Sequence, residues 1–394
     1  MYIRLRLRNW RSIEDADIIL APFTVVVGKN SSGKSNLIDA LLFASEVGRD
    51  AATAVSRRGG IVGIRRWSPS KPYQITLDVC VAASEDALKV SSSRHEMVIG
   101  SGRQGEWKFL RETITLTEGG KQLQRYQREG GSLTIQAAQP IISGIPSGTS
   151  VGIADTTSAM LFARQLGRGT GGRLPPWLAQ VRSLRPVPEL MRRPQPIADS
   201  AKLDETASNV ATALHRMTAV QRGVILESMR RIIPGLVDVQ TQANGRYLTL
   251  VFTQQHAADR RPDFAATEMS DGALRALAVI IAAQQMAQHE LLLIEEPEVN
   301  LHPGAARVVY DALSRAARRG AVLITTHSPE LLDHAREDTI LVCEYANGTT
   351  RVGPLASAQR ALVREGLYST AELMRAEELR REGATPRVVQ AAQG

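Results

Sequence analysis

The sequence predicts an α/β fold with a mixed β-sheet core, an antiparallel β layer and a helical lobe. An apolar, β-branched run at 23–27 leads through a glycine-rich loop into an uninterrupted helix pattern at 35–47. Further along, a short, fully apolar strand pattern at 291–294 is followed by a helix pattern at 304–318 and by another strand pattern at 321–326. Between these regions, alternating strand patterns predict the antiparallel layer, at 74–82, 108–117 and 132–136.

Composition and charge limit the class of protein. The 394 residues are 43% hydrophobic and 22% charged, as in ordinary globular proteins. The net charge of +8 and the pI of about 9.8 favour an anionic partner, with nucleic acid the first candidate. The alternative is a basic surface that only keeps the protein soluble.

Cysteine usage and hydropathy indicate in which cellular compartment we expect the protein. Cys80 and Cys343 have neither disulfide nor metal spacing, so we expect a reduced, cytoplasmic protein. No apolar run approaches the ~18 residues that a membrane-spanning helix needs, so we expect no membrane partner.

Other stretches connect or flank these elements. Residues 2–8 alternate apolar and basic side chains as in a strand, and 48–72 is rich in Gly, Arg and Ser, as in a loop. Residues 199–233 have a helix pattern that Pro234-Gly235 ends. From residue 356 the chain is rich in Ala, Arg and Glu, which predicts a helical tail.

The glycine-rich loop is a phosphate-binding motif. It reads GKNSSGKS, the GxxxxGK[ST] pattern, between a strand and a helix as the motif requires. The backbone N–H groups of such a loop and the helix N-terminus surround an anion. Lys34 would reach the β- and γ-phosphates of ATP, and the Ser35 hydroxyl would hold Mg²⁺. We expect the phosphate-binding residues to be Gly28, Lys29, Asn30, Ser31, Ser32, Gly33, Lys34, Ser35 and Asn36.

Two adjacent carboxylates follow the apolar strand at 291–294. Glu295 would hold the Mg²⁺, and Glu296, just past the strand end, would polarise the attacking water. Because neighbouring side chains on a strand point to opposite sides, the two acids are expected to have different roles. The alternative, an acidic turn at the surface, is disfavoured beside a phosphate loop.

A histidine and a helix start complete the set of candidate residues. His327 follows the strand at 321–326, where it would sense or stabilise the transferred phosphoryl group; the alternative is a histidine with an ordinary polar contact. The long helix pattern at 272–288 begins after Met-Ser-Asp-Gly, and Ser and Gly at a helix start leave N–H groups free for an anion. The alternative there is a plain helix cap.

Taken together, these motifs resemble the ABC-type ATPase heads of the SMC, RecF and OLD group. The residues that carry the resemblance are GKNSSGKS, MSDGALR, LLLIEEPEVNLHP and LITTHSPELL, in this order, and the OLD-like ATPases are the most similar. The opening LRNWRSI is similar to the first-strand element of these heads. The resemblance implies a P-loop ABC-type ATPase head that binds and hydrolyses ATP with Mg²⁺. Transporter heads carry Gly-Gly-Gln where this chain has Asp271-Gly272-Ala273, which argues against a transporter.

The resemblance also implies roles for single residues. Ser270 and Gly272 would contact the γ-phosphate held by a second subunit. Glu296 would be the catalytic glutamate, His327 the switch histidine and Lys34 the catalytic lysine. The residues expected to flank the nucleotide are Trp10, Arg11 and Ser12.

The motifs divide the chain into four expected parts. These are an N-terminal part of the ATPase head, an inserted β/helical lobe, a C-terminal part of the head and a helical tail, over 1–90, 91–235, 236–355 and 356–394. The glutamine loop of such heads has two candidate positions, Gln74 and Gln180, and neither is favoured.

The resemblance implies a homodimer joined through ATP, from which a higher oligomer could grow. OLD-family nucleases carry a Toprim metal site after the THSP strand, but no paired-aspartate motif follows His327 here. We therefore expect no nuclease activity in this chain and a separate effector nuclease. The expected role is a regulatory or sensor ATPase in DNA repair or antiviral defence; the alternative is a nucleotide-gated scaffold without nucleic-acid contact.

A basic segment is the expected contact with DNA. Between Arg164 and Arg193 the chain has one acid, Glu189, and a tryptophan, Trp177. Unpaired charges cannot pack into a core, and the Arg guanidinium suits phosphate, so this segment would bind a nucleic-acid backbone. The alternative is pairing with acids of the same subunit or of a partner. The arginines are Arg164, Arg168, Arg173, Arg182, Arg185, Arg192 and Arg193.

Overall fold

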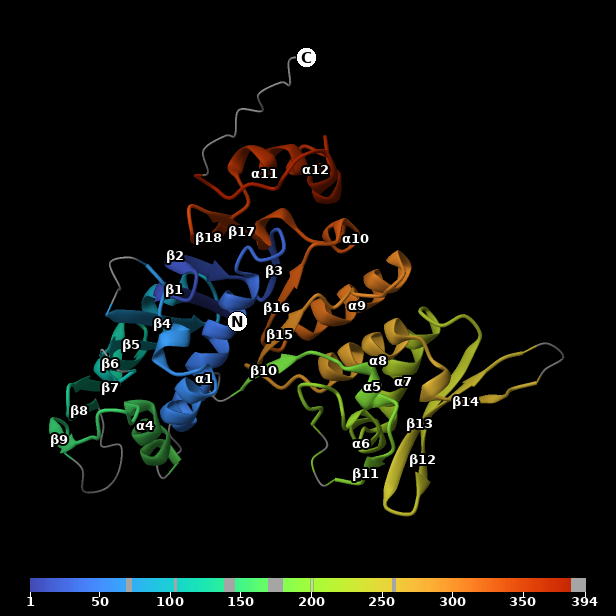
Figure 1. Ribbon diagram of the computed structural model, residues 1–394, viewed down its shortest axis with the longest axis horizontal. Helices are drawn as coiled ribbons and strands as arrows, with labels where there is room; N and C mark the ends of the chain where they lie inside the picture. Colours follow the sequence, from blue (N-terminus) through green and yellow to red (C-terminus); the bar gives the residue numbers. More distant parts are fainter. Residues whose placement is uncertain are drawn as a thin grey trace.

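The computed structural model describes residues 1–68, 73–102, 105–137, 146–168 (backbone only for 165–168), 180–198, 200, 202–256 and 260–383. Figure 1 shows how the elements follow one another. The strands are β1 (Tyr2–Trp10), β2 (Ile13–Leu20), β3 (Phe23–Val27), β4 (Gln74–Ala82), β5 (Ser92–Ser101), β6 (Trp107–Glu118), β7 (Lys121–Glu129), β8 (Ser132–Ala137), β9 (Thr149–Gly152), β10 (Val181–Leu184), β11 (Gln195–Pro196), β12 (Leu236–Asn244), β13 (Tyr247–Gln254), β14 (Asp263–Ala265), β15 (Leu291–Glu295), β16 (Ala321–Thr326), β17 (Ile340–Ala346) and β18 (Thr349–Pro354). The helices are α1 (Lys34–Ser56), α2 (Ile61–Ile64), α3 (Ala87–Val90), α4 (Ala159–Arg168), α5 (Pro188–Met191), α6 (Val210–His215), α7 (Ala219–Arg230), α8 (Asp271–Gln284), α9 (Pro303–Ala316), α10 (Pro329–Leu332), α11 (Ser357–Arg364) and α12 (Thr370–Ala376), with 3₁₀ helices η3 (Ala266–Glu268) and η4 (Glu337–Thr339).

A 14-stranded mixed sheet runs through the molecule. Its strands β10, β15, β16, β3 and β17 are parallel neighbours, whereas β2, β1 and β4 to β9 pair antiparallel. Every residue of β3 and β16 is buried, because helices or loops cover both faces of the parallel part, and such strands read as continuous apolar runs. The mixed sheet core and the antiparallel layer predicted from the sequence are confirmed.

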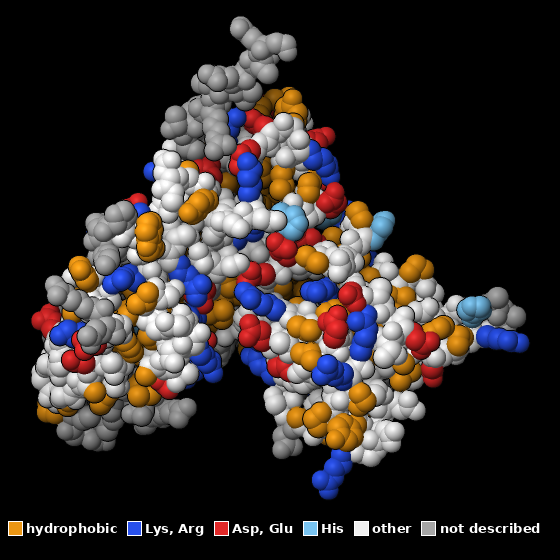
Figure 2. Space-filling view, in the orientation of Figure 1, with side chains coloured by type: hydrophobic (Ala, Val, Ile, Leu, Met, Phe, Trp, Pro, Cys, Tyr) orange, Lys and Arg blue, Asp and Glu red, His pale blue; other side chains and the backbone are white. Residues whose placement is uncertain are grey.

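A second, smaller sheet belongs to the helical lobe. Its order is β11-β13-β12, and β14 pairs with β13. Together with α5, α6, α7 and α8 it forms the lobe on the right of Figure 1. Figure 2 shows that this lobe and the antiparallel layer diverge from the parallel strands and leave a notch between them.

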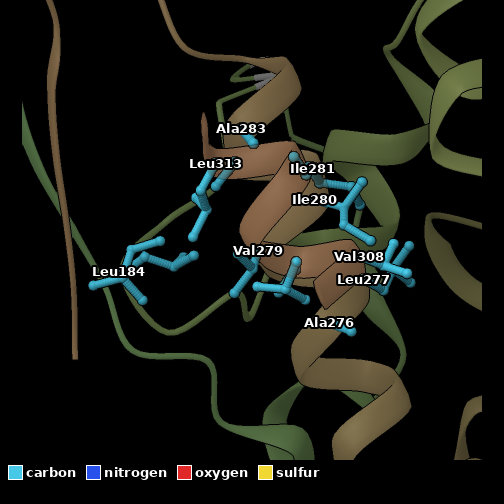
Figure 3. Packing of buried hydrophobic residues seen from close by; sticks show 14 of the residues in the cluster. Leu184, Ala276, Leu277, Val279, Ile280, Ile281, Ala283, Val308 and Leu313 are labelled. Atoms are coloured by element: carbon cyan, nitrogen blue, oxygen red, sulfur yellow. The ribbon is translucent and has the colours of Figure 1, made fainter. Parts of the chain in front are cut away.

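Helix α8 lies at the centre of the core of the helical lobe. Its residues are buried from Gly272 onward except for Arg275 and the last residue, as expected for a helix that is apolar on all sides. Figure 3 shows α8 side chains packed with Val308 and Leu313 of α9 and with Leu184 at the end of β10. The core thus joins the sheet edge at β10 to the helices behind it.

The expected loop at 48–72 is wrong in its first part. Helix α1 continues to Ser56 past a kink at Asp50, where φ is −157° and ψ is 99°. Ala54 and Val55 are almost fully buried, because apolar residues recur at helical spacing beyond the kink. The Gly, Arg and Ser content of the stretch concealed this spacing.

The single helix expected at 199–233 is also wrong, because the structure has two shorter helices, α6 and α7. The residues before α6 turn around Asp204, whose carboxylate accepts hydrogen bonds from the backbone N–H of Ser208 at 2.9 Å and from its hydroxyl at 2.5 Å. Such side-chain bonds offer the backbone an alternative to a helix.

The boundary expected near residue 90 lies between two paired strands of one sheet. β4 and β5 pair from Val81 opposite Ser93 to Gln74 opposite Gly100. The strands that follow residue 91 therefore continue the sheet of the N-terminal part.

In the described parts of the chain, no helix has the length and apolar content to cross a membrane.

Leu277→Ala should lower the free energy of unfolding by about 2–5 kcal/mol, because Leu277 is 0% exposed at the centre of α8 and the change leaves a cavity. Val220→Ala on α7 is the control, since Val220 is 79% exposed, and should change stability by less than about 0.5 kcal/mol. Urea unfolding followed by circular dichroism measures both. Equal destabilisation by the two variants would contradict the core described above.

Candidate nucleotide-binding site

Three neighbouring parallel strands bring the predicted motifs to one edge of the sheet. β3 ends at Val27 before the glycine-rich loop, β15 ends at Glu295, and β16 ends one residue before His327. In sheets of this kind, ligands bind at the carboxyl ends of the strands. A cavity of about 440 Å³ lies there, lined by Asn30, Ser31, Ser32, Gly33, Lys34, Ser35, Asn36, Glu295, Glu296 and Thr325.

Two glycines give the phosphate loop its shape. Gly28 has φ of +155° and Gly33 has φ of +103°. A Cβ at Gly28 would lie 2.3 Å from the carbonyl oxygen of Cys343, and one at Gly33 would lie 2.3 Å from Oγ1 of Thr350. Only glycine therefore fits at either position, because β17 and β18 press against the loop.

Lys34 reaches across the loop from the first turn of α1. Its Nζ donates hydrogen bonds to the carbonyl oxygens of Gly28 at 2.7 Å and Lys29 at 3.1 Å. Burial lowers the pKa of this ammonium, and the nearby charge of Glu296 opposes that effect. A buried cation at the mouth of an anion-binding loop is suited to charge-assisted hydrogen bonds with phosphate oxygens.

A chain of polar groups supports the loop from behind. Oγ1 of Thr350 donates to the carbonyl oxygen of Ser32 at 2.9 Å and lies 2.7 Å from Oγ of Ser12. Nδ2 of Asn36 donates to the same Ser12 oxygen at 2.6 Å. Ser12 and Asn36 therefore help to fix the position of the loop.

Trp10 and Arg11 lie beneath α1. Trp10 is 0% exposed, its Nε1 donates to the carbonyl oxygen of Asn36 at 3.0 Å, and its ring centroid lies 5.0 Å from that of Phe43. Arg11 forms an ion pair with Asp39 at 2.9 Å. The described contacts of the Trp10 ring are with α1, and the expectation that Trp10 flanks the nucleotide stays a prediction.

Ser35 and Glu295, the two residues expected to hold Mg²⁺, contact each other directly. Oγ of Ser35 donates to Oε2 of Glu295 at 2.5 Å, at the N-terminus of α1. Hydroxyl and carboxylate oxygens are the donors that Mg²⁺ prefers, and this ion usually keeps several waters, so two protein oxygens suit it. The other carboxylate oxygen, Oε1, contacts Nη2 of Arg185, the residue that follows β10.

Glu296 has different surroundings from Glu295. Its Oε1 lies 3.1 Å from Nδ1 of His327, and both side chains are partly exposed. Glu296 has φ of +47°, a conformation that non-glycine residues adopt rarely and that is found disproportionately at functional sites. The two adjacent acids thus face different partners, Ser35 and His327.

Ser270 and Gly272 lie at the start of α8, outside the cavity lining found in the described part of the chain. Ser270 is the exposed N-cap of α8 and accepts a hydrogen bond from the backbone N–H of Ala273 at 3.2 Å. A Cβ at Gly272 would lie 2.1 Å from the carbonyl oxygen of Asn300. The structure therefore gives Ser270 a capping role and Gly272 a packing role within the subunit.

Among its described residues, the basic segment between Arg164 and Arg193 contacts its own chain at several arginines. Arg164 donates to the carbonyl oxygen of Gly48 at 3.2 Å, and Figure 2 shows acidic and basic side chains interleaved around the notch. Arg173, Trp177 and the side chain of Arg168 lie outside the described residues. Three arginines pair with carboxylates of the same chain: Arg182 with Glu290 at 2.8 Å, Arg185 with Glu295, and Arg192 with Asp271 at 2.5 Å.

Neither candidate for the glutamine loop lies at the cavity among the residues described. Gln180 precedes β10 at the amino end of that strand, where its carbonyl oxygen accepts from the N–H of Leu291 at 3.0 Å. Gln74 begins β4 in the antiparallel layer. At the carboxyl end of β10, beside the cavity, the chain has Arg185.

Sequence reasoning missed the roles of Arg185 and Thr350. Arg185 had been assigned to a DNA-contacting segment, because the four-residue strand before it, VRSL, has no apolar run that would identify it. Thr350 belongs to no motif, and its hydrogen bond to Ser32 joins residues 318 positions apart. Only the pairing of strands could reveal either contact.

Two family descriptions match parts of the chain. Residues 183–333 match "AAA domain, putative AbiEii toxin, Type IV TA system", and residues 1–100 match "AAA ATPase domain". The chromosome partition protein Smc of a Synechococcus species is 32% identical over 139 residues. That match covers 34% of this chain and only 12% of the Smc protein.

Solved structures share the fold. The structure of the SmcHead bound to the C-winged helix domain of ScpA aligns with a TM-score of 0.55 at 15% identity, over 92% of this chain and 99% of that chain. The Smc head domain with an extended coiled coil, bound to the C-terminal domain of ScpA and derived from Pyrococcus furiosus, aligns with a TM-score of 0.54 at 13% identity, over 93% and 100%. The chain therefore has an SMC head-like α/β fold with a large mixed sheet, and it carries a phosphate-loop motif at the end of β3.

Lys34→Ala should weaken ATP binding by at least about a hundredfold, because the buried Nζ at the phosphate loop is expected to supply charge-assisted contacts with phosphate. Lys89→Ala, at an exposed lysine of α3, is the matched control and should change affinity by less than about twofold. Titration with a fluorescent ATP analogue measures both. Equal losses in the two variants would refute the role of Lys34.

Proposed function

We propose that this chain binds ATP with Mg²⁺ and hydrolyses it at a site that a second copy of the chain completes. The observation that carries the proposal is the convergence of three groups at adjacent strand ends: Lys34, the Ser35–Glu295 pair and the Glu296–His327 pair. Positioning of phosphates, charge compensation and orientation of the attacking water are the requirements of phosphoryl transfer. These residues match the requirements one by one.

The proposed chemistry assigns one task to each group. Lys34 and the backbone of the phosphate loop bind the β- and γ-phosphates, while Ser35 and Glu295 hold Mg²⁺, which neutralises phosphate charge when bound. Glu296 orients the attacking water and accepts its proton. His327, 3.1 Å from Glu296, holds that carboxylate in place and contacts the transferred phosphoryl group.

The second copy is proposed because the start of α8 lies outside the cavity of its own subunit. Ser270 is exposed at the N-terminus of a 14-residue helix, whose free N–H groups and dipole favour an anion. In a head-to-head homodimer, Ser270 and the backbone at Gly272 of one copy would contact the γ-phosphate held by the other. The same contact would make dimer formation dependent on ATP.

The proposed biological role is a cytoplasmic regulatory or sensor ATPase of the OLD-like type, acting in DNA repair or antiviral defence with a separate effector nuclease. The order of the motifs supports this role, and a toxin–antitoxin system appears in one matched family description. The Smc heads of similar fold are bound to domains of ScpA, which fits a protein partner on the head. DNA contact through Arg164–Arg193 has less support, because three of its arginines are paired within the chain.

Glu296→Gln should keep ATP affinity within about threefold and lower hydrolysis by roughly 10²–10⁴-fold, because the change removes only the proton acceptor. Glu14→Gln is the control, since Glu14 is an exposed glutamate in β2. Phosphate release and nucleotide affinity are measured for both. Hydrolysis by Glu296→Gln at the wild-type rate would overturn the catalytic assignment.

Ser270→Arg should abolish ATP-dependent dimerisation, because the arginine side chain would occupy the position proposed for the γ-phosphate that the other copy holds. Thr218→Arg removes another exposed N-cap, that of α7, and controls for the capping energy of about 1 kcal/mol. Light scattering with ATP and without it, in the Glu296→Gln background, measures dimerisation. Gly272→Asp is not a suitable variant, because its Cβ would collide with the carbonyl oxygen of Asn300 within the subunit.

If Ser270→Arg dimerises like its control, the start of α8 is only a helix cap.

The rival function, a nucleotide-gated scaffold, predicts ATP-dependent dimerisation without salt-sensitive DNA binding. Binding of duplex DNA at several salt concentrations distinguishes the two, because neutralised phosphates make log affinity fall linearly with log salt.

A further inference from the structure

A buried carboxyl near the Glu296–His327 pair has no task in the function proposed above. It belongs to Glu298, which is 7% exposed and lies two residues after Glu296, in the turn that follows β15. Acidic side chains are rarely buried to this extent unless they are paired. The partners of Glu298 therefore indicate why the chain has a carboxyl at this position.

The partner of Glu298 is the residue before His327. Thr326, the last residue of β16, is 0% exposed, and its Oγ1 donates a hydrogen bond to Oε1 of Glu298. The same Oγ1 accepts a hydrogen bond from the backbone N–H of Ser328 at 2.9 Å. A threonine oxygen that binds the N–H two residues further on closes a local turn. His327 is the residue in the middle of this turn.

The turn that carries Glu296 is joined to the turn that carries His327 at two places. The backbone N–H of Glu296 donates to the carbonyl oxygen of Thr325 at 2.9 Å. The second connection is the side-chain bond from Thr326 to Glu298. One connection thus precedes His327 along the chain at each of two successive residues, and both reach the turn that begins at Glu296.

Stability alone does not account for a carboxyl at this position. Burial raises the pKa of Glu298 and so favours its neutral form, although the hydrogen bond from Thr326 opposes this effect. The second oxygen, Oε2, is buried and has no hydrogen-bond partner among the residues that the structure describes. Because burying an unpaired polar atom costs free energy, the carboxyl has another reason to be there.

We propose that Glu298 is a positioning residue for ATP hydrolysis and acts through Thr326 on His327. The hydrogen bond between Glu298 and Thr326 holds the turn of His327 in place relative to the turn of Glu296. His327 then meets Glu296 at the observed 3.1 Å and keeps that carboxylate directed at the attacking water. This inference rests on the function proposed above and gives Glu298 no contact with the nucleotide.

A positioning residue affects the rate of the chemical step more than the binding of ATP. Glu298 is not among the residues that line the cavity at the phosphate loop, so its loss should leave the contacts with phosphate in place. A displacement of about 1 Å at a reacting group can lower the rate by about a hundredfold. The expected signature is therefore a lower kcat at an unchanged KM.

The first test removes the hydroxyl of Thr326. Thr326→Val has nearly the same shape and should lower kcat about 10–100-fold, with the KM for ATP within about twofold. Thr326→Ser keeps the hydroxyl and should stay within about threefold of the wild-type kcat. Thr212→Val is the matched control, because Thr212 is also 0% exposed and donates to the carbonyl oxygen of Pro196 at 3.2 Å in the helical lobe. A wild-type kcat in Thr326→Val would overturn the inference.

The second test removes the carboxyl. Glu298→Ala should lower kcat as much as Thr326→Val, and the double variant should lose no more than either single variant, because both changes remove the same bond. Glu298→Gln keeps an acceptor oxygen in a neutral side chain and should stay within about threefold of the wild-type kcat. Losses that multiply in the double variant would show that the two residues act separately, which contradicts the inference.

Nuclear magnetic resonance of protein with isotope-labelled histidine tests the step through His327. The ring signals of His327, identified by their loss in His327→Ala, should move in Thr326→Val and stay in place in Thr212→Val. Unmoved signals in a Thr326→Val protein of lowered kcat would overturn the inference, because the effect would not pass through His327. Absence of ATP hydrolysis by the wild type would instead overturn the proposed function, whereas the ring signals report on the bond alone.

Discussion

The close approach of β17 and β18 to the phosphate loop is the contact on which the site depends. Gly28 lies against the Cys343 carbonyl and Gly33 against Thr350 so tightly that no Cβ fits at either glycine. Thr350 also donates to the carbonyl oxygen of Ser32. The conformation of the anion-binding loop is therefore set by a hairpin from a distant part of the sequence. Any shift of this hairpin would change the shape of the loop.

The charged groups around the cavity are held by partners that a nucleotide can replace. Lys34 donates to backbone carbonyls, Glu295 shares its oxygens between Ser35 and Arg185, and Glu296 pairs with His327. Partly exposed ion pairs contribute ~1 kcal/mol or less, so exchanging them costs little. Stability comes instead from the two hydrophobic cores on either side of the sheet. The molecule thus separates a rigid framework from a site whose contacts are easily exchanged.

Local sequence patterns predicted the framework and the residues that line the candidate site. The strand at 321–326 was predicted with its exact bounds, because a mainly apolar run that ends in two threonines before a polar turn is a local signal. The glycine loop was equally readable, since its chemistry requires particular residues at particular spacings. The contact of Arg185 with Glu295 was not predictable, because it depends on the register of β10 against β15. The helix beyond Gly48 was missed because polar residues masked its buried stripe, and the buried position of Trp10 depends on packing against Phe43.

The place of β3 in the sheet has a consequence for synthesis of the chain. Its two neighbours are β16 and β17, which the ribosome makes long after β3, and the bond from Thr350 to Ser32 spans 318 positions. At ~5–20 residues per second, both edges of β3 wait roughly 15–60 s for their partners. During that interval β1 and β2 can already form a hairpin, but β17 and β18, which pack against the phosphate loop, have not yet been made. The nascent chain therefore exposes apolar strand edges until late in translation, and the phosphate loop reaches its final shape only after β17 and β18 have been made.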